Sequence, residues 1–266
     1  MRSNTDIDFK IYGEELQFVE IELDPGETVI GEPGGFMMME DGIEMQTIFG
    51  DGSAQQGTGL LGKLFSAGKR VLVGENMFMT AFTNVGQGKK KVSFAAPYTG
   101  KIVPLDLQQL GGSILAQKDA FLCAAKGVSI GIAFQRRLGT GIFGSEGFIM
   151  EKLDGDGLAF VHAGGYIMEK DLRPGEILKV DTGCVVAYTP SVDFDIEFIR
   201  GIRNWMFGGE GLFFALLKGP GKVWLQSLPI SRLASWIIQY SPQFGQRREE
   251  GSILGGIGNL LDGDGF

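Results

Sequence analysis

The chain has 266 residues, a net charge of −8 and 43 glycines, and this length can bury a core as one large all-β unit or as two domains. The acidic balance argues against broad nucleic-acid binding, which depends on cations that neutralise phosphates. Because the glycines follow no Gly-x-y period, collagen is excluded, and they indicate many tight turns between short strands.

Residues 1–101 are predicted to form a first β-rich unit. Charged and apolar side chains alternate over residues 18–23, as in a half-buried strand, and a Pro-Gly-Glu turn follows at 25–27. A Gly-, Gln- and Ser-rich insertion begins at Gly50 and interrupts the unit. Further strands are predicted at 36–39, 43–45, 74–79 and 91–94.

Residues 102–165 are predicted to form a second unit of the same kind. Its strands are predicted from apolar or alternating runs at 102–107, 121–124 and 128–130. A Gly-Ser-Glu-Gly turn at 144–147 precedes a further apolar run, and Asp-Gly turns follow at 154–157.

Residues 166–229 form a third predicted unit, in which the pattern is clearest. A second Pro-Gly-Glu turn at 174–176 opens it. The alternation of charged and apolar residues at 193–198 again matches a half-buried strand. The other predicted strands lie at 184–188, 212–217 and 222–226.

The spacing of turn residues indicates one module present three times. The turn glutamate and the next glycine turn lie 11 residues apart in both the second unit, from Glu146, and the third, from Glu210. Each module is too small to bury its apolar side well, so three modules would cover one another and close into a ring-like body. Because no long helical pattern alternates with the strands, the predicted class is all-β and not parallel α/β.

Residues 230–266 do not continue the strand pattern and are predicted to form a C-terminal helix and a glycine-rich tail. Ser231 can cap a helix that Pro242 ends, because apolar side chains recur at helical spacing between them. These side chains are Leu233, Trp236, Ile237 and Tyr240. The apolar, glycine-rich tail at 253–261 is expected to be a loosely packed terminus, with a subunit or membrane-surface contact as the alternative.

The two cysteines and the lack of a long apolar run indicate the cellular compartment in which the protein works. Cys123 and Cys184 lie in apolar, strand-like runs without metal-binding spacing, so two buried reduced thiols are expected rather than a disulfide. The polar first ten residues contain no secretory signal, and no run of 18 apolar residues could span a bilayer. A cytoplasmic location is therefore expected.

Distributed turn motifs carry a family resemblance over residues 8–262. They are Asp24-Pro25-Gly26-Glu27, the Gly-Glu elements at Glu75, Glu146 and Glu210, and Gly219-Pro220-Gly221. The sequence resembles a widespread family of uncharacterised bacterial and archaeal proteins related to the mitochondrial protein named for altered inheritance of mitochondria.

The resemblance implies a fold like that of the tryptophan RNA-binding attenuation protein, with three double-stranded β-helix repeats around a pseudo-threefold axis. It carries over no catalytic residues. The mitochondrial relative is associated with inner-membrane organisation, which implies a membrane-linked scaffold role. RNA or tryptophan binding does not follow, because a fold does not fix a function.

His162 is the only histidine, so any Ser-His-Asp or Cys-His mechanism would have to use it. It lies in an apolar strand-like run at 160–164 without neighbouring ligands, which favours a structural side chain. One histidine and no cysteine cluster argue against a familiar zinc site, and no phosphate-binding glycine loop is present. No catalytic residue and no cofactor are predicted, and a non-enzymatic protein is favoured.

Glu75, Glu146 and Glu210 have equivalent places in the three predicted units. Were they to converge, three carboxylates would need a hard cation such as Ca²⁺ or Mg²⁺ between them. The alternative, which ordinary turn chemistry favours, is that each accepts backbone N–H bonds in its own turn and faces water.

The segments before these glutamates mix basic and bulky apolar residues. Repetition would place the segments on one side of the molecule, as a surface for a partner or an anionic membrane. Alternatively, the apolar side chains fold inward while the basic ones reach solvent. The residues of this predicted interaction surface are Leu64, Phe65, Arg136, Arg137, Phe143, Arg203, Trp205 and Phe207.

Two hypotheses for the function follow. The leading one is a non-enzymatic scaffold or interaction protein, homo-oligomeric or bound to a protein partner, with peripheral membrane contact through the apolar and basic loops. The rival is a small-molecule or divalent-metal-binding protein with a site between the units. Neither involves a nucleic-acid partner.

Overall fold

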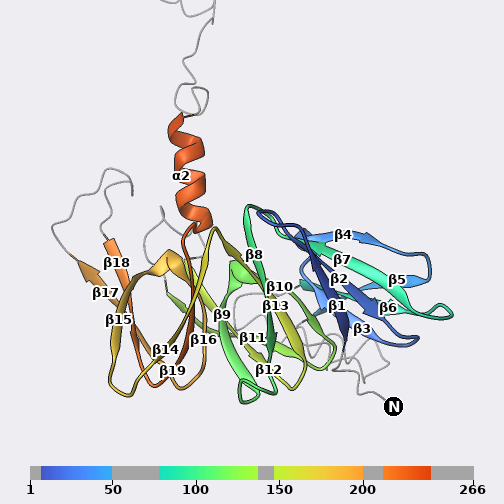
Figure 1. Cartoon of the computed structure of the whole chain (residues 1–266), viewed down its shortest axis with the longest axis horizontal. Coiled ribbons are helices and arrows are strands. Elements are labelled where there is room, and N and C mark those ends of the chain that lie inside the picture. Colours follow the sequence, from blue (N-terminus) through green and yellow to red (C-terminus); the bar gives the residue numbers. More distant parts are fainter. Residues whose placement is uncertain (1–6, 50–77, 137–146, 200–211, 241–266) are drawn as a thin grey trace, which may run out of the picture.

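The computed structural model describes residues 7–49, 78–136, 147–199 and 212–240. Strands dominate these residues, and an α-helix, α2 (Ile230–Tyr240), follows the last strand (Figure 1). The predicted all-β class with a short C-terminal helix is therefore confirmed. The predicted tail at 253–261 lies outside the described residues.

The strands fall into three successive sets, preceded by β1 (Asp8–Tyr12). The first set comprises β2 (Phe18–Leu23), β3 (Thr28–Gly31), β4 (Phe36–Met39), β5 (Ile43–Phe49), β6 (Phe78–Asn84) and β7 (Lys90–Ala95). The second comprises β8 (Gly100–Asp106), β9 (Ser113–Gln117), β10 (Phe121–Ala125), β11 (Ser129–Arg136), β12 (Phe148–Asp154) and β13 (Leu158–Gly164). The third comprises β14 (Ile167–Leu172), β15 (Ile177–Asp181), β16 (Val185–Tyr188), β17 (Asp193–Ile199), β18 (Leu212–Lys218) and β19 (Gly221–Gln226).

Four antiparallel pairings occur in each set. In the first set β2 and β4 pair with β7, while β3 and β5 pair with β6. In the second, β8 and β10 pair with β13, while β9 and β11 pair with β12. In the third, β14 and β16 pair with β19, while β15 and β17 pair with β18. A single-turn 3-10 helix precedes β4, β10 and β16, at Pro33–Gly35, Lys118–Ala120 and Thr182–Cys184.

Neighbouring sets are joined by continuous sheets. β3 pairs with β10, and β9 pairs with β16, which produces two six-stranded sheets between a four-stranded and a three-stranded sheet. Among the described residues, no strand pairs with the outer edge of β4 or of β15, and these two strands lie at opposite ends of the body (Figure 1). The strand pairings of the described residues join the three sets in a row, and the ring-like body expected from the sequence stays a prediction.

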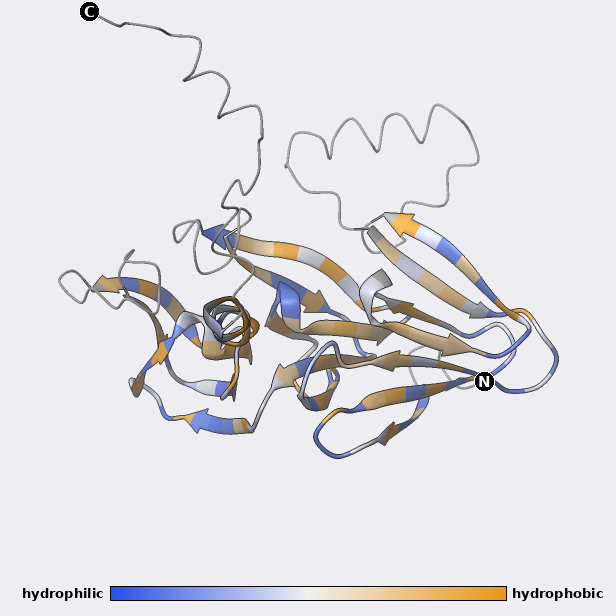
Figure 2. Cartoon of the chain, turned by 90° about the horizontal axis from the view of Figure 1, so that it is seen from above, coloured by the Kyte–Doolittle hydropathy of each residue, from blue (hydrophilic) through white to orange (hydrophobic). Residues whose placement is uncertain are grey.

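Alternating apolar side chains build the core. In β2, Val19, Ile21 and Leu23 are fully buried while the glutamates between them are partly exposed, as the alternation predicted. Every residue of β10 and β16 is buried, because each lies inside a six-stranded sheet. Figure 2 shows apolar residues along the strands and polar residues at many of the turns.

The predicted Pro-Gly-Glu turns have the expected conformation. Gly26 and Gly175 adopt φ values of +86° and +78°, which only glycine adopts without strain. In the first turn the side chain of Glu27 accepts the N–H of Asp24 at 2.7 Å. Glu176 does the same in the third set, which fixes both turns through their own glutamates.

Helix α2 has the predicted apolar spacing but begins earlier than predicted. Its first residue is Ile230, so Ser231 lies inside the first turn and not at the cap. The carbonyl of Pro229 accepts N–H bonds from Arg232 and Leu233 instead. Among the described residues, no helix has the length and hydrophobicity needed to cross a bilayer.

Candidate functional site

The predicted site residues fall almost entirely outside the described residues. This holds for Glu75, Glu146 and Glu210 and for all of the predicted interaction surface except Arg136. Arg136 ends β11 with its side chain half exposed, and its guanidinium lies 3.5 Å from a carboxylate oxygen of Asp195. No group of three or more His, Cys, Asp or Glu side chains in the described part of the chain could hold a metal ion.

A cavity of about 170 Å³, with mostly apolar walls and several polar side chains, lies where the second and third strand sets meet the start of α2. It lies beside the 3-10 helices that precede β10 and β16, and the ends of β13 and β19 also contribute to its wall. The polar side chains that line it are Tyr98, Gln117, Asp119, His162, Gln226 and Ser231.

His162 is the most unusual group in this cavity. Its side chain is in β13, and the residue is 2% exposed. The ring packs edge-on against Tyr98 with 4.5 Å between centroids, and a Cβ at Gly100 would come within 2.7 Å of its Nε2. Neither ring nitrogen makes a hydrogen bond of good geometry to a described residue, although the backbone of Tyr98 lies close, so His162 is a buried polar side chain that is poorly satisfied.

Burial sets the charge of the cavity. It lowers the pKa of His162 to about 4, and the nearby backbone of Tyr98 opposes this only in part. Burial and the charge of Asp119 raise the pKa of Tyr98 to about 12. At neutral pH the imidazole and the phenol are therefore both uncharged.

Gln226 ties the cavity wall together. Its Oε1 accepts the N–H of Gly164 at 2.8 Å, and its Nε2 donates to the carbonyl of Gly183 at 2.8 Å. Gly164 belongs to β13 and Gly183 to the 3-10 helix before β16. One amide side chain thus links the second strand set to the third.

The geometry of the cavity suits the binding of water or a small molecule. A neutral histidine without a hydrogen-bonded carboxylate lacks the orienting partner that a catalytic base needs. The volume of about 170 Å³ is below the 300–1,000 Å³ typical of drug-sized ligand pockets. At ~30 Å³ per water, the cavity holds roughly six waters or one small molecule.

The cysteines are not activated thiols. Both are free: Cys123 is buried, and Cys184 is partly buried beside Arg232, whose guanidinium lies 3.8 Å from its sulfur. Burial raises the pKa of Cys123 well above its ordinary value. Burial and then the charge of Asp181 also raise that of Cys184, although Arg232 opposes the rise.

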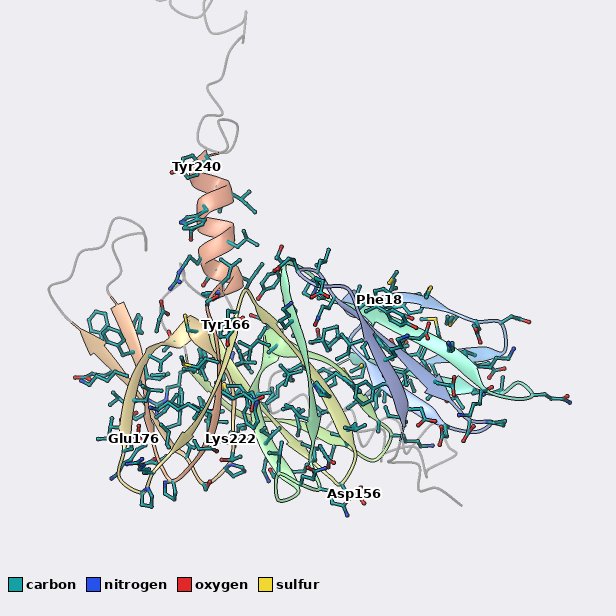
Figure 3. The ribbon with its side chains drawn as sticks, in the orientation of Figure 1. Phe18, Asp156, Tyr166, Glu176, Lys222 and Tyr240 are labelled. Carbon is teal, nitrogen blue, oxygen red and sulfur yellow. The ribbon has the colours of Figure 1, made fainter. Side chains whose placement is uncertain are left out.

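Helix α2 covers the cavity with its first turns and exposes its outer half. Arg232 anchors the inner end, because it lies 3.2 Å from Asp181 and donates to the carbonyl of Ser227. Beyond Ser235 the helix stands away from the sheets, with Tyr240 at its far end (Figure 3). The exposed apolar residues of this outer half are Trp236, Ile237, Ile238 and Tyr240.

These features define a β-sheet protein with a small cavity that contains a buried histidine, with unactivated thiols and with a helix whose outer half exposes apolar side chains. The chain belongs to the AIM24 family, described as mitochondrial biogenesis AIM24, whose family model matches residues 9–228. The family membership predicted from the turn motifs is thereby confirmed.

Relatives extend over most of the chain. A protein of Streptococcus pyogenes serotype M6, itself named as uncharacterised, is 28% identical over 232 residues, which cover 86% of this chain and 88% of that protein. The crystal structure of another Streptococcus pyogenes protein matches with a TM-score of 0.68 at 24% identity, over 89% of this chain and 100% of that one. At that identity the likeness shows the fold alone.

The sequence placed His162 on a strand but did not reveal the cavity. Tyr98, His162 and Gln226 are separated by more than 60 residues at each step, and only the packing of two strand sets brings them together.

Proposed function

We propose that this protein is a non-enzymatic scaffold or interaction protein that works in the cytoplasm through surface contacts, including peripheral attachment to membranes. The observation that carries the proposal is the outer half of α2, where four apolar residues are each 49–80% exposed. Figures 1 and 3 show this helix standing away from the β body. The free thiols of Cys123 and Cys184 support a reducing compartment.

The composition of α2 suits a lipid–water boundary. Leu233, Trp236, Ile237 and Tyr240 recur on one side of the helix, while Ser231, Arg232 and Ser235 lie on the other side together with the exposed Ile238. Tryptophan and tyrosine prefer the headgroup level because their rings are amphipathic. The helix carries no acidic side chain, so the negative charge of the protein resides elsewhere.

The proposed attachment surface also includes the predicted loop residues. Each of the three loop segments joins the two strands of a hairpin with the same place in its set, namely β5–β6, β11–β12 and β17–β18. This shared position supports a common role. The residues are Leu64, Phe65, Arg136, Arg137, Phe143, Arg203, Trp205 and Phe207.

The proposal includes three internal repeats with a fold like that of the tryptophan RNA-binding attenuation protein. The recurrence of four strand pairings supports it. The proposed boundaries are 1–101, 102–165, 166–229 and 230–266, although β8 already begins at Gly100.

Liposome flotation tests the membrane attachment. Wild-type protein should float with vesicles of mixed neutral and anionic lipids, and Trp236→Asp and Ile237→Asp should each reduce the floated fraction severalfold, because a charge at this depth opposes insertion. Trp205→Asp and Phe143→Asp test the loops in the same assay. The matched control is Met168→Asp, an exposed apolar residue of β14 on the body. Absent flotation of wild type, or equal flotation of all variants, would remove the membrane role.

A second candidate is a small-molecule or divalent-metal-binding protein, which the poorly satisfied His162 in its cavity favours. The ligand would be a small polar molecule, and the group of it that contacts the neutral imidazole would be uncharged. The metal version would use Glu75, Glu146 and Glu210. Native mass spectrometry after metal-free dialysis, with and without Ca²⁺ or Mg²⁺, tests that version, and an unchanged mass and unchanged melting temperature would exclude it.

A further inference from the structure

Two buried polar residues of the second strand set line the cavity, and each has a counterpart in the third set. His162 follows the residue of β13 that pairs with the start of β10, as Gln226 follows the residue of β19 that pairs with the start of β16. Gln117 and Asp181 are likewise the residues that immediately precede the 3-10 helices of the two sets. The two positions can therefore be compared between the sets.

In the third set, groups of the protein satisfy both side chains. Gln226 donates to the carbonyl of Gly183 and accepts the N–H of Gly164, each at 2.8 Å. Asp181 accepts the N–H of Gly183 at 3.0 Å, which caps the 3-10 helix, and also pairs with Arg232. Both polar side chains of the third set therefore serve the structure itself.

In the second set, the same two positions are left without good partners. Gln117 is 5% exposed, its side chain does not cap the following 3-10 helix, and it makes no hydrogen bond to another described residue. His162 is 2% exposed and poorly satisfied, and the ring of Tyr98 packs against it. Buried polar groups of this kind cost free energy unless water or a ligand satisfies them. The second set therefore directs two unused polar side chains at one cavity.

The hydrogen-bonding groups of the cavity define what a ligand must offer. The neutral ring of His162 has one N–H and one lone pair, and the amide of Gln117 has two N–H donors and a carbonyl acceptor. Burial raises the pKa of Tyr98 to about 12, so its hydroxyl keeps its proton and can donate. A ligand that satisfies these groups must both donate and accept hydrogen bonds.

Charge and size narrow the ligand further. Asp119 is the only charged side chain that lines the cavity among the described residues, so an anion is repelled. A cation would lose its hydration against the apolar part of the wall, which includes Ala120, Pro229 and Ala234, and Asp119 already takes part in an interaction of its own. At ~30 Å³ per water-sized group, about 170 Å³ has room for roughly four to six non-hydrogen atoms. The ligand is therefore small and neutral.

We propose that the cavity binds a small neutral carboxamide. A carboxamide carries an N–H next to a carbonyl oxygen, so it can pair with the amide of Gln117 through two reciprocal hydrogen bonds. Its second N–H is then available to the lone pair of His162. The ligand thus satisfies the second set with an amide, as the side chain of Gln226 satisfies the third from within the chain. This inference rests on the second candidate function and names the class of its ligand.

Nitrogen NMR of the histidine tests the proposal, because the chain contains only one. In full-length protein labelled with ¹⁵N-histidine, the ring signals belong to His162 and report a hydrogen bond to its lone pair. Acetamide, acetate, acetamidinium and acetone share one shape, but only acetamide is neutral and both donates and accepts. Because ligands this small bind weakly, each probe is titrated to about 100 mM. Acetamide should shift the ring signals saturably, and the other three should bind at least roughly tenfold more weakly.

Two variants and a matched control locate the binding. Gln117→Leu removes the paired amide, and Ala234→Leu fills the cavity from α2, so each should weaken acetamide binding by roughly tenfold or more. The control, Gln109→Leu, changes a glutamine on the exposed surface and should bind acetamide as wild type does. Backbone amide spectra that match wild type away from the cavity show that a variant is folded, and either variant alone is sufficient for the test.

Three results would each overturn the proposal: no saturable shift with acetamide, an equal or stronger response to one of the other probes, or unchanged acetamide affinity in the folded variants. A stronger response to another probe would remove the carboxamide and keep a small-molecule function. The absence of a response to all of the probes would remove that function of the cavity as well.

Discussion

Gln226→Leu should destabilise the protein by about 3 kcal/mol. The substitution replaces the polar amide by an apolar side chain of similar size and leaves the N–H of Gly164 and the carbonyl of Gly183 without their 2.8 Å partners. A buried backbone group that loses its partner costs ~1–3 kcal/mol, and two such groups are affected. For a chain of this length, that loss lowers the melting temperature by roughly 6–12 °C.

Urea unfolding followed by circular dichroism measures this change, with Gln109→Leu as the control. The side chain of Gln109 contacts Asp106 on the exposed surface, so its replacement should change stability by less than ~0.5 kcal/mol. Equal stability of the Gln226 and Gln109 variants would refute the reasoning, because it would mean that the two backbone groups find water or other partners at no cost.

Three further changes have defined outcomes. The pKa of His162 is lowered to about 4, so between about pH 6.5 and pH 4 the unfolded chain binds a proton more readily than the folded one, and the free energy of unfolding falls as the pH drops through this window. His162→Gln should remove on the order of 1–2 kcal/mol of that loss at about pH 5. Urea unfolding at pH 7 and pH 5 measures it, and an equal loss of stability in wild type and variant would contradict it. Gly100→Ala would drive its Cβ into the carbonyl of Ala163 and should lower the melting temperature markedly, whereas Gly131→Ala meets open space and should not, as differential scanning calorimetry would reveal. Asn84→Ala removes three hydrogen bonds from a fully buried amide and should cost ~2–4 kcal/mol in urea unfolding; a loss below 1 kcal/mol would show that the turn finds other partners.

Local patterns were sufficient to predict the class of fold and many of its strands. The alternation at 18–23 coincides with β2, because side chains of a half-buried strand alternate between core and solvent. The apolar run at 36–39 coincides with β4. The Pro-Gly-Glu turns could also be predicted from the sequence, because glycine readily adopts the positive φ that Gly26 and Gly175 have. Short strands such as β3 and β15 were missed, because four or five apolar or mixed residues carry little periodicity.

Pairing and burial between distant segments could not be predicted from local patterns. Nothing in the sequence Phe36-Met37-Met38-Met39 distinguishes an exposed edge from the buried strand that Phe121–Ala125 forms at the corresponding place. Only the number of strand sets in the chain decides which of them lacks a neighbour. The cavity around His162 likewise depends on contacts between sets, and the outcome for Glu75, Glu146 and Glu210 lies outside the described residues.

The two continuous sheets that cross from set to set have a consequence for how the molecule opens. The middle set shares hydrogen bonds with a neighbour on both sides, through β3–β10 and β9–β16, whereas each outer set has one neighbour. With nearest-neighbour coupling of this kind, amide hydrogen exchange should be slowest in the middle set and faster in both outer ones. Partial unfolding would therefore begin at the ends and spread inward, and the interior edges would be the last to meet solvent.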